Sequence, residues 1–351
     1  MFNINSLVQQ LPSSFISAVQ QTIDLKTKPQ GSLGLLEPLA AKIAKIQHSL
    51  SPSLNAPCVL IFAADHGIAD EGVSLFPKAV TEQMVLNFLS GGAAINCFSR
   101  QNGLDLTIVN AGVSCDFVGV EHSGFINKPI AKGTNNFSVT EAMSEKQYLQ
   151  ALQQGADIVS SKYNAGCNVI GFGEMGIANT TSAAAIMSAL LNLSGANCAG
   201  KGTGVDEAGV LHKANVIDQA IELHQLKAAS PAQVLQKVGG FEIVMMVGAM
   251  LKAAELSMLV LVDGFICSVA ALAASKMEAN FIEYTQFCHQ SNEQAHQRLL
   301  AAMDVQPLLN LGMRLGEGSG VAVAYPLVVS AVSFFNEMAS FADAGVSNSE
   351  G

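Results

Sequence analysis

Short apolar runs rich in β-forming residues alternate along the chain with longer stretches of helical periodicity. The runs that predict strands are Cys58–Ala63, Leu106–Asn110, Asn168–Gly171 and Met258–Val262. The stretches that predict helices are Glu82–Phe98, Glu145–Tyr163, Thr181–Leu193 and Glu242–Leu256. Strands that are apolar throughout and are connected through helices are typical of parallel sheets covered on both faces. The pattern therefore predicts an α/β fold with a mostly parallel sheet flanked by helices.

All of the strand patterns fall within residues 31–284, which we expect to form a large α/β nucleotide-binding domain. Residues 1–30 and 285–351 look mainly helical and lack strong strand patterns, so we expect them to pair as a small helical domain that completes the site. The apolar segment Phe241–Ser275 is interrupted by Lys252, Glu255 and Asp263. It therefore predicts a buried helix, strand and helix rather than a membrane span.

Each predicted strand runs into a polar or glycine-bearing loop. These loops are Asp65–Gly67, Asn110–Gly112, Gly171–Gly176 and Asp263-Gly264. In open α/β sheets, the loops at the carboxyl ends of the strands build the ligand site. We therefore expect the functional residues of this chain to gather at that edge of the sheet.

Composition and charge restrict the possible partners and the cellular compartment. The 351 residues are 50% hydrophobic and carry a net charge of −10 without a Lys/Arg cluster, so the basic surface that nucleic acids or anionic membranes require is missing. The seven cysteines form no C-x-x-C pair, which favours reduced thiols. The first residues show neither a basic region nor a long apolar run, so no signal peptide is expected and the protein is predicted to be cytoplasmic.

Glu317 is the residue whose setting points most directly to chemistry. It lies between Gly316 and Gly318, just before an apolar helical run, Val321–Ala331. Glycine on both sides permits a sharp turn and lets a ligand approach the backbone closely. Such an acid is poorly explained by packing or by surface solvation, so we interpret Glu317 as a catalytic or ligand-binding residue, with a plain glycine-rich cap as the alternative.

The segment Gly171–Gly176 has the form G-x-G-x-x-G, follows a strand and leads into a predicted helix start at Asn179-Thr180-Thr181. A helix N-terminus suits a phosphate. A dinucleotide enzyme would place an acid about twenty residues further on to hold the ribose, yet no Asp or Glu occurs between Met175 and Val205. The pattern favours a mononucleotide phosphate or ribose site over a dinucleotide fold, and a structural turn is the remaining alternative.

A second glycine-rich loop, Gly200–Val205, is followed by Lys213. Backbone amides and a lysine suit a phosphate, although the full G-x-x-x-x-G-K-[ST] order of a P-loop is absent. Asp65 and His66 at a strand end are expected to form a hydrogen-bonded structural pair. The histidines lack metal-ligand spacing, so no metal site is expected.

Residues 289–293 form a polar stretch between an apolar run and a predicted helix. Ser291 is a plausible helix N-cap. The alternative is that its amide and hydroxyl receive a carboxylate ligand at the helix start.

Taken together, these segments resemble the nicotinate-nucleotide:dimethylbenzimidazole phosphoribosyltransferase family of cobalamin lower-ligand biosynthesis. The matching segments occur in order along nearly the whole chain: Lys28–Gly34, Ala64–Gly67, Asp70–Val73, Gly171–Thr181, Gly202–Gly204, Gly239–Glu242, Asp263–Phe265 and Met313–Gly320. The ordered set is far more specific than any one segment.

The resemblance implies a Rossmann-like sheet, a homodimer, and no metal or organic cofactor. It also implies transfer of phosphoribosyl from nicotinate mononucleotide to a ring nitrogen of 5,6-dimethylbenzimidazole, with inversion to the α-nucleotide and release of nicotinate. Glu317 matches the general base of the family, which agrees with the reading of its glycine neighbours.

The resemblance further assigns binding residues. Those expected to hold the phosphate and ribose are Glu174, Met175, Gly176, Ala178, Asn179, Thr180, Gly202, Thr203, Gly204 and Lys213, with Glu174 contacting Lys213 or the sugar. Ser291 and Gly318 are expected near the nicotinate carboxylate. The residues expected to line the acceptor-base pocket are Phe76, Met84, Met175 and Leu315.

Three departures from the family pattern bear on the acceptor base. Phe76 stands where some members carry Ser, Asn110 stands where Asp is common, and Gln294-Ala295 replaces a glycine-bearing pair. A more apolar pocket leaves open a phenol or another benzimidazole as acceptor. The rival functions are a nucleotide-dependent oxidoreductase, which the missing ribose acid disfavours, and a nucleotide sensor without turnover, which gives Glu317 no purpose.

Overall fold

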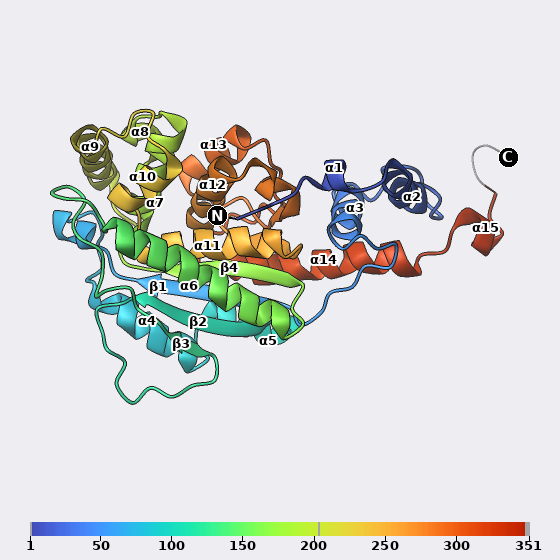
Figure 1. The fold of residues 1–351 in the computed structure, drawn as a ribbon, viewed down its shortest axis with the longest axis horizontal. Helices are drawn as coiled ribbons and strands as arrows, with labels where there is room; N and C mark the ends of the chain where they lie inside the picture. The colour runs from blue at the N-terminus through green and yellow to red at the C-terminus, as the bar shows by residue number, and fades with distance from the viewer. Residues whose placement is uncertain (1, 203, 348–351) are drawn as a thin grey trace.

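Residues 2–202 and 204–347 are described by a computed structural model, in which one parallel sheet forms the centre (Figure 1). Its six strands run in the order β3-β2-β1-β4-β5-β6. They are β1 (Cys58–Ala64), β2 (Asp105–Gly112), β3 (Phe125–Asn127), β4 (Val169–Met175), β5 (Leu259–Val262) and β6 (Thr285–Phe287). The predicted parallel α/β sheet is thus confirmed.

The two edge strands were not predicted, and β6 lies within residues 285–351, where no strong strand pattern is present. Strands β3 and β6 are three residues each. Three residues carry too little alternation to stand out from a loop. Their pairing with a longer neighbour, rather than their own pattern, makes them strands.

The helices fill the connections between the strands and both ends of the described chain. They are α1 (Leu7–Gln10), α2 (Ser13–Asp24), α3 (Leu36–Ile46), α4 (Ala79–Leu89), α5 (Ala94–Asn102), α6 (Glu145–Asn164), α7 (Asn179–Leu191), α8 (Gly195–Cys198), α9 (Glu207–Leu223), α10 (Pro231–Val238), α11 (Phe241–Glu255), α12 (Phe265–Met277), α13 (Gln294–Ala302), α14 (Ser319–Glu337) and α15 (Phe341–Ala344), with 3-10 turns at Gly67–Glu71 and Ala279–Tyr284. The single helix predicted over Glu82–Phe98 is two helices, because Gly91 adopts a positive φ of 78° between them.

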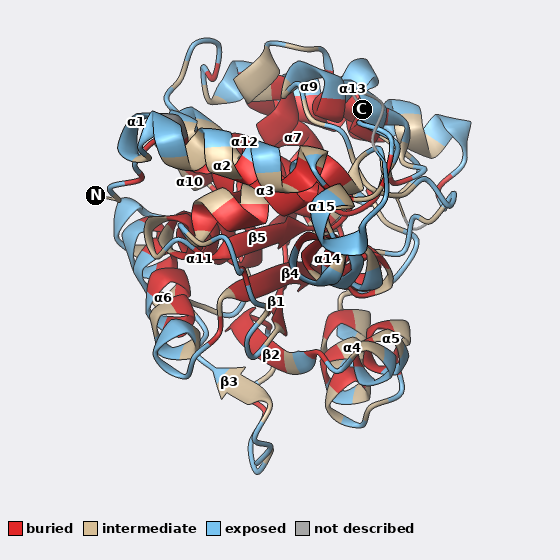
Figure 2. Cartoon of the chain, turned by 90° about the vertical axis from the view of Figure 1, so that its right-hand side faces the viewer, coloured by how far each residue is buried: buried red, intermediate tan, exposed pale blue. Residues whose placement is uncertain are grey.

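Helices cover the sheet from both sides, with α6 and α11 on one side and α4, α5 and α14 on the other (Figure 2). Glycines allow the close contacts. A Cβ on Gly155 of α6 would lie 1.9 Å from the Met245 carbonyl oxygen of α11, and one on Gly171 of β4 would lie 2.4 Å from Val321 of α14. The segment Phe241–Ser275 folds as the predicted helix, strand and helix, with α11, β5 and α12 nearly all buried.

Segments near the two ends of the chain pair with each other beyond the sheet. Lys26 forms an antiparallel bridge with Ser340, and α2, α3 and α15 lie at the same end of the molecule (Figure 1). The division into domains at residues 31–284 stays a prediction. Among the described residues, α14 alone has the length and composition of a membrane-crossing helix, but 56% of its apolar window is buried, as in a core helix.

The strand order changes direction between β1 and β4. From β1 the chain continues outward through β2 and β3, and from β4 it continues the other way through β5 and β6. Connections that leave neighbouring strands in opposite directions open a crevice at their carboxyl ends, where ligands bind in folds of this kind.

Candidate active site

A cavity of about 380 Å³ lies at the carboxyl ends of β4 and β5. Its walls come from α4, the β4–α7 turn, the loop at Gly202, the start of α12, the segment before α13 and the loop before α14. The predicted site residues among its lining are Phe76, Met84, Glu174, Met175, Gly176, Asn179, Thr180, Gly202, Ser291, Leu315 and Glu317. Segments far apart in the sequence are therefore brought to one cavity, as the strand-end loops predicted.

Glu317 is held in an unusual backbone conformation at this cavity. Gly316, Glu317 and Gly318 have φ values of 86°, 64° and 81°, all in the left-handed region. The loop lies directly on β4, since a Cβ on Gly173 would be 2.6 Å from the Glu317 carbonyl carbon. A left-handed non-glycine residue is uncommon and concentrates at functional sites, which agrees with the role inferred from its glycine neighbours.

The surroundings of Glu317 favour its protonated form. Burial raises the pKa of the Glu317 carboxyl above its usual value, and a hydrogen bond from the Ile95 backbone at the start of α5 opposes this, while the Asp263 charge adds to it. The Oε2 atom has no hydrogen-bond partner among the described residues. A carboxylate with raised pKa and a free oxygen is suited to accept a proton from a ligand.

Glu174, at the end of β4, is a second buried carboxyl in the same cavity. Asn179 donates a hydrogen bond to its Oε2 atom. Burial raises the pKa of Glu174 to about 8, and the charges of Asp263, Glu242 and Glu317 act in the same direction. The expected contact between Glu174 and Lys213 is not formed, because the Lys213 ammonium group bonds Thr180 and the Gly200 carbonyl instead.

Replacing Glu174 by Gln is expected to stabilise the protein at alkaline pH. Because the folded-state pKa lies above the unfolded value, wild-type stability should fall as pH rises from about 4.5 to about 8. The Gln variant is neutral throughout and still accepts from Asn179, so its advantage should grow to roughly 2–4 kcal/mol at the alkaline end. Urea unfolding across this range measures it. Glu121→Gln, at an exposed carboxyl, is the control, and a pH-independent difference for the Glu174 variant would contradict the prediction.

The β4–α7 turn and the Gly202 loop converge at one end of the cavity. Helix α7 begins at Asn179 with Ala178, φ 73°, as its N-cap, so the expected cap by Asn179-Thr180-Thr181 is wrong. The Asn179 side chain is directed to Glu174 instead. A Cβ on Gly176 would lie 2.4 Å from the Ala64 carbonyl oxygen, which explains the glycine where the chain leaves β4 beside the end of β1.

Lys213 supplies a buried positive charge behind this end of the cavity. Its Nζ donates to Thr180 Oγ1 at 3.0 Å and to the Gly200 carbonyl oxygen at 3.3 Å. The side chain is 1% exposed, and burial lowers its pKa to about 8. The charge of Glu293 partly opposes this effect, but no ion pair between Lys213 and a carboxylate is formed among the described residues. A buried ammonium group without a direct ion pair is costly. An anion bound beside Gly202 and Thr180 would offset that cost and use the third N–H of the lysine.

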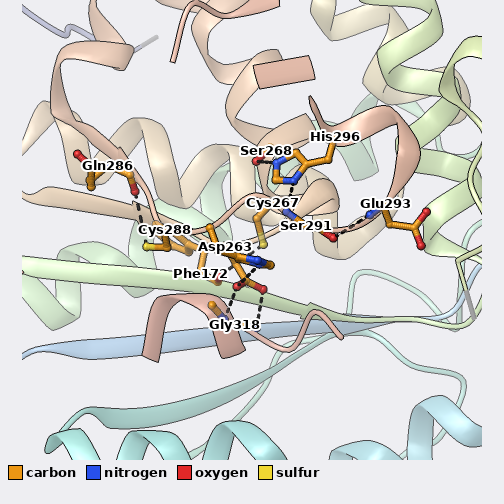
Figure 3. A network of polar contacts seen from close by, with 12 residues as sticks. Phe172, Asp263, Cys267, Ser268, Gln286, Cys288, Ser291, Glu293, His296 and Gly318 are labelled. Carbon is orange, nitrogen blue, oxygen red and sulfur yellow. Dashed lines mark hydrogen bonds and ion pairs between the residues drawn. The ribbon is translucent and has the colours of Figure 1, made fainter. Parts of the chain in front are cut away.

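Ser291 is held by a buried histidine. Helix α13 begins at Gln294 with Glu293 as N-cap, so the expectation that Ser291 caps a helix is wrong. The backbone N–H of Ser291 donates to His296 Nδ1 at 2.8 Å, and His296 Nε2 lies 2.9 Å from Ser268 Oγ (Figure 3). Burial lowers the pKa of His296 to about 3, so the ring is neutral. Because Nδ1 accepts, the ring proton is on Nε2 and is donated to Ser268.

Asp65 and His66 do not form the expected pair. His66 Nε2 lies 2.6 Å from Glu242 Oε1, with both side chains fully buried, while Asp65 accepts from the Ser114 backbone. Proximity in the sequence suggested Asp65 as the partner of His66, but the partner is Glu242, which lies 176 residues further on. Within residues 2–202 and 204–347 no cluster of metal-ligating side chains is found.

The four residues predicted to hold the acceptor base, Phe76, Met84, Met175 and Leu315, all line the cavity, together with Val80. Phe76 and Leu315 are 49% and 55% exposed, so the cavity has apolar surface available to a ligand. Aromatic bases are held by such surfaces.

Four predicted binding residues do not line the cavity: Ala178, Gly204, Lys213 and Gly318. Lys213 lies behind the lining and Gly318 donates its N–H to Asp263. Thr203 lies outside the described residues. Lining residues without a predicted role are Val80, Ile177, Asp263, Gly264, Phe265, Ile266, Cys267, Glu293, Arg314 and Gly316. Of these, Asp263 directly follows β5, and its place in a strand-end loop was the signal for a position at the cavity.

Comparisons with known proteins agree over almost the whole chain. The sequence model of a family described as "Phosphoribosyltransferase" matches residues 8–346. The nicotinate-nucleotide–dimethylbenzimidazole phosphoribosyltransferase of Dechloromonas aromatica is 51% identical over 350 residues, which cover 99% of this chain and 100% of that protein. The protein of that name from Shewanella piezotolerans is 49% identical, with 99% of each chain covered.

Solved structures show the same likeness. The crystal structure of CobT from Thermus thermophilus superposes with a TM-score of 0.91 at 36% identity, covering 95% of this chain and 99% of that one. Sequence and fold thus each match over at least 95% of the chain. The chain therefore belongs to the nicotinate-nucleotide–dimethylbenzimidazole phosphoribosyltransferase family.

Proposed function

We propose that the protein transfers the 5-phosphoribosyl group of nicotinate mononucleotide to a ring nitrogen of 5,6-dimethylbenzimidazole in cobalamin nucleotide-loop assembly. The products are nicotinate and the α-nucleotide of the acceptor base. The observation that carries this proposal is the Glu317 carboxyl group, which is buried with a raised pKa in a cavity that also has apolar lining residues and a buried lysine bonded to its lining residue Thr180. The names of the relatives support the same reaction.

The reaction requires the protein to position the two substrates and to provide one proton acceptor. The acceptor nitrogen forms a bond to C1′ of the ribose while the bond from C1′ to the nicotinate nitrogen breaks. That nitrogen leaves with the bonding pair as a neutral pyridine, so it needs no proton. Attack from the opposite face inverts C1′, and the N–H proton of the benzimidazole passes to Glu317.

We propose that the β4–α7 turn and the Gly202 loop bind the sugar phosphate. Gly176, Asn179 and Thr180 bring the start of α7 to the cavity, where a helix N-terminus favours phosphate. The Lys213 ammonium group, bonded to Thr180 Oγ1, would supply a positive charge near the phosphate. Met175, Ala178 and Gly204 belong to the same two loops and are included in the proposed site. Ser291, fixed by His296, is proposed to receive the nicotinate carboxylate, with Gly318 nearby.

The residues proposed to bind the acceptor base restrict its identity less than the residues proposed to bind the donor restrict the nucleotide. Its proposed wall consists of Phe76, Val80, Met84, Met175 and Leu315, side chains without a charge to select one ring system. Another benzimidazole or a phenol is therefore the alternative acceptor for the same reaction.

Product analysis tests the proposal directly. The protein is incubated with nicotinate mononucleotide and, in separate reactions, benzimidazoles, purines and phenols, and the products are identified by mass spectrometry. Nicotinate release together with an α-linked ribotide supports the proposal and ranks the acceptors. Nucleotide binding without nicotinate release from any acceptor would instead favour a sensor, and reduction of a bound nicotinamide dinucleotide would favour an oxidoreductase.

Replacing Lys213 by Met is expected to weaken binding of nicotinate mononucleotide by about 10–100-fold, as loss of a charged hydrogen bond implies. Isothermal titration measures this, and nicotinate riboside, which lacks the phosphate, is the control ligand. The variant should bind the riboside as the wild type does. An equal loss for both ligands would contradict a phosphate role for Lys213.

We also propose that the enzyme is a cytoplasmic homodimer that needs no metal or organic cofactor. The buried free thiols of Cys58, Cys167 and Cys198 suit a reducing compartment. Apolar Leu25 and Val346, which follow α2 and α15, are 46% and 51% exposed, which suits a contact with a second copy. Light scattering that gives a mass near 36.6 kDa, the mass of one chain, would reject the dimer.

A further inference from the structure

Asp263 connects the end of β5 to the start of α14, two elements that are far apart in the sequence. Its Oδ2 accepts a hydrogen bond from the Gly318 backbone N–H at 3.0 Å, and its Oδ1 accepts one from the Gly320 N–H at 2.7 Å (Figure 3). The carboxylate is 1% exposed and lines the cavity beside Glu317. Both of its oxygens therefore hold the backbone that immediately follows Glu317.

This backbone needs a restraint from outside. Glu317 has a φ of 64°, a conformation that costs a residue with a Cβ about 1–2 kcal/mol. The flanking glycines incur no such penalty and are free to adopt many other conformations. A short loop of this composition keeps one shape only if other groups fix it. The two N–H bonds to Asp263 are charge-assisted, and hydrogen bonds of that kind are among the stronger ones in proteins.

His289 fixes Asp263 in turn. Its Nε2 lies 3.5 Å from Asp263 Oδ1, and its ring packs against Gly320, where a Cβ would lie 2.0 Å from His289 Cδ2. The ring is 1% exposed, and neither ring nitrogen has a hydrogen-bond partner among the described residues. The imidazole thus fills the space behind the carboxylate and leaves it little freedom to rotate away from the loop.

We propose that Asp263 is a positioning residue for the transfer reaction: by holding the N–H groups of Gly318 and Gly320, it keeps the Glu317 carboxyl group in the cavity. This inference rests on the proposed function, because it assigns Glu317 as the proton acceptor. Asp263 acts through Glu317 and does not itself take up a proton. Its negative charge has a second effect, since it raises the pKa of Glu317 and so strengthens that group as a base.

A helix cap without a role in the reaction would use the same hydrogen bonds, so the test must separate the two roles. The charged and titratable groups that surround Glu317 and Asp263 are Glu174 from β4, Glu242 from α11, Cys267 from α12, Cys288 and His289 after β6, and Arg314 in the loop before α14. Asp263→Asn removes one negative charge from this set and one of the two N–H acceptors, while the side chain keeps its size.

The experiment measures kcat, KM and the pH dependence of the rate for the wild type and Asp263→Asn. We expect kcat to fall by about 10–100-fold with KM for nicotinate mononucleotide within about threefold of wild type. The acid limb of the rate profile should move to lower pH, because the neighbouring negative charge is lost. The control is Glu283→Gln, since Glu283 also accepts at the start of a helix, from Ser6 and Leu7, away from the cavity.

An unchanged kcat and an unmoved acid limb in Asp263→Asn would overturn the proposal, as would an equal kcat loss in Glu283→Gln. If Asp263→Asn is insoluble, Asp263→Glu replaces it: the charge stays but the acceptors move by one methylene. A fall in kcat with the acid limb in place would then support the proposal, and wild-type kcat would overturn it. A wild type that releases no nicotinate rejects the proposed function itself, which is a different outcome from an active wild type with an equally active variant.

Discussion

Glu317→Gln is expected to fold and bind nicotinate mononucleotide but to turn over about 10²–10⁴-fold more slowly than the wild type, as loss of a general base implies. Gln has nearly the same size and can accept the hydrogen bond from the Ile95 backbone, so the loop should keep its shape. It cannot take up the benzimidazole proton. Steady-state release of nicotinate measures the rate, and calorimetry checks that nucleotide binding is retained.

The matched control is Glu293→Gln, which changes another carboxyl group that lines the cavity. Glu293 lies near the Gly200 loop, so its loss should affect kcat far less than the loss of Glu317. Near-normal turnover of Glu317→Gln would reject the base assignment. The acceptor would then lose its proton to solvent, and positioning alone would account for the rate.

Gly173→Ala is expected to damage catalysis by moving the backbone that carries Glu317. A Cβ at Gly173 would lie 2.6 Å from three backbone atoms of Glu317 and Gly318, so the loop has to shift. Overpacking of this kind costs about 1–3 kcal/mol of stability. A displacement of about 1 Å at a reacting group lowers the rate by about 10²-fold, so we expect kcat to fall by that order.

Gly171→Ala separates the two effects. It lies two residues earlier on the same strand, and its Cβ would meet the Val321 side chain rather than the Glu317 backbone. Both variants should show a lower midpoint in thermal unfolding, but only Gly173→Ala should lose turnover. A Gly173→Ala enzyme with wild-type kcat would mean that the position of the Glu317 loop is not critical.

The sequence predicted the long buried strands, which depend on extended apolar patterns, and the Glu317 loop, which depends on the backbone conformation of a few residues. Continuous apolar runs identified β1, β2, β4 and β5, because a strand buried on both faces has to be apolar along its length. The glycines around Glu317 identified its loop, because a left-handed turn against a strand leaves no space for other side chains. Both signals are contained in a few neighbouring residues.

The sequence did not predict contacts that depend on how distant segments meet. His66 pairs with Glu242 rather than with its neighbour Asp65, and Lys213 bonds Thr180 rather than Glu174. Nothing in the local sequence distinguishes these partners, since they are brought together by the packing of α11 and α9 around the strand ends. The bonds that Asp263 accepts were not predicted for the same reason, because they come from a loop that follows 55 residues later.

The order of the strands has a consequence for how this enzyme family can change. Three residues of the proposed acceptor wall, Phe76, Val80 and Met84, lie in α4 or just before it, after β1. The proposed phosphate site comes largely from the β4–α7 turn, on the other side of the switch in strand order. If these assignments hold, substitutions in and just before α4 would alter which aromatic ring is accepted and leave the recognition of the donor unchanged. Under the proposed function, a fold divided in this way would allow new lower ligands to arise by a few point mutations around one helix.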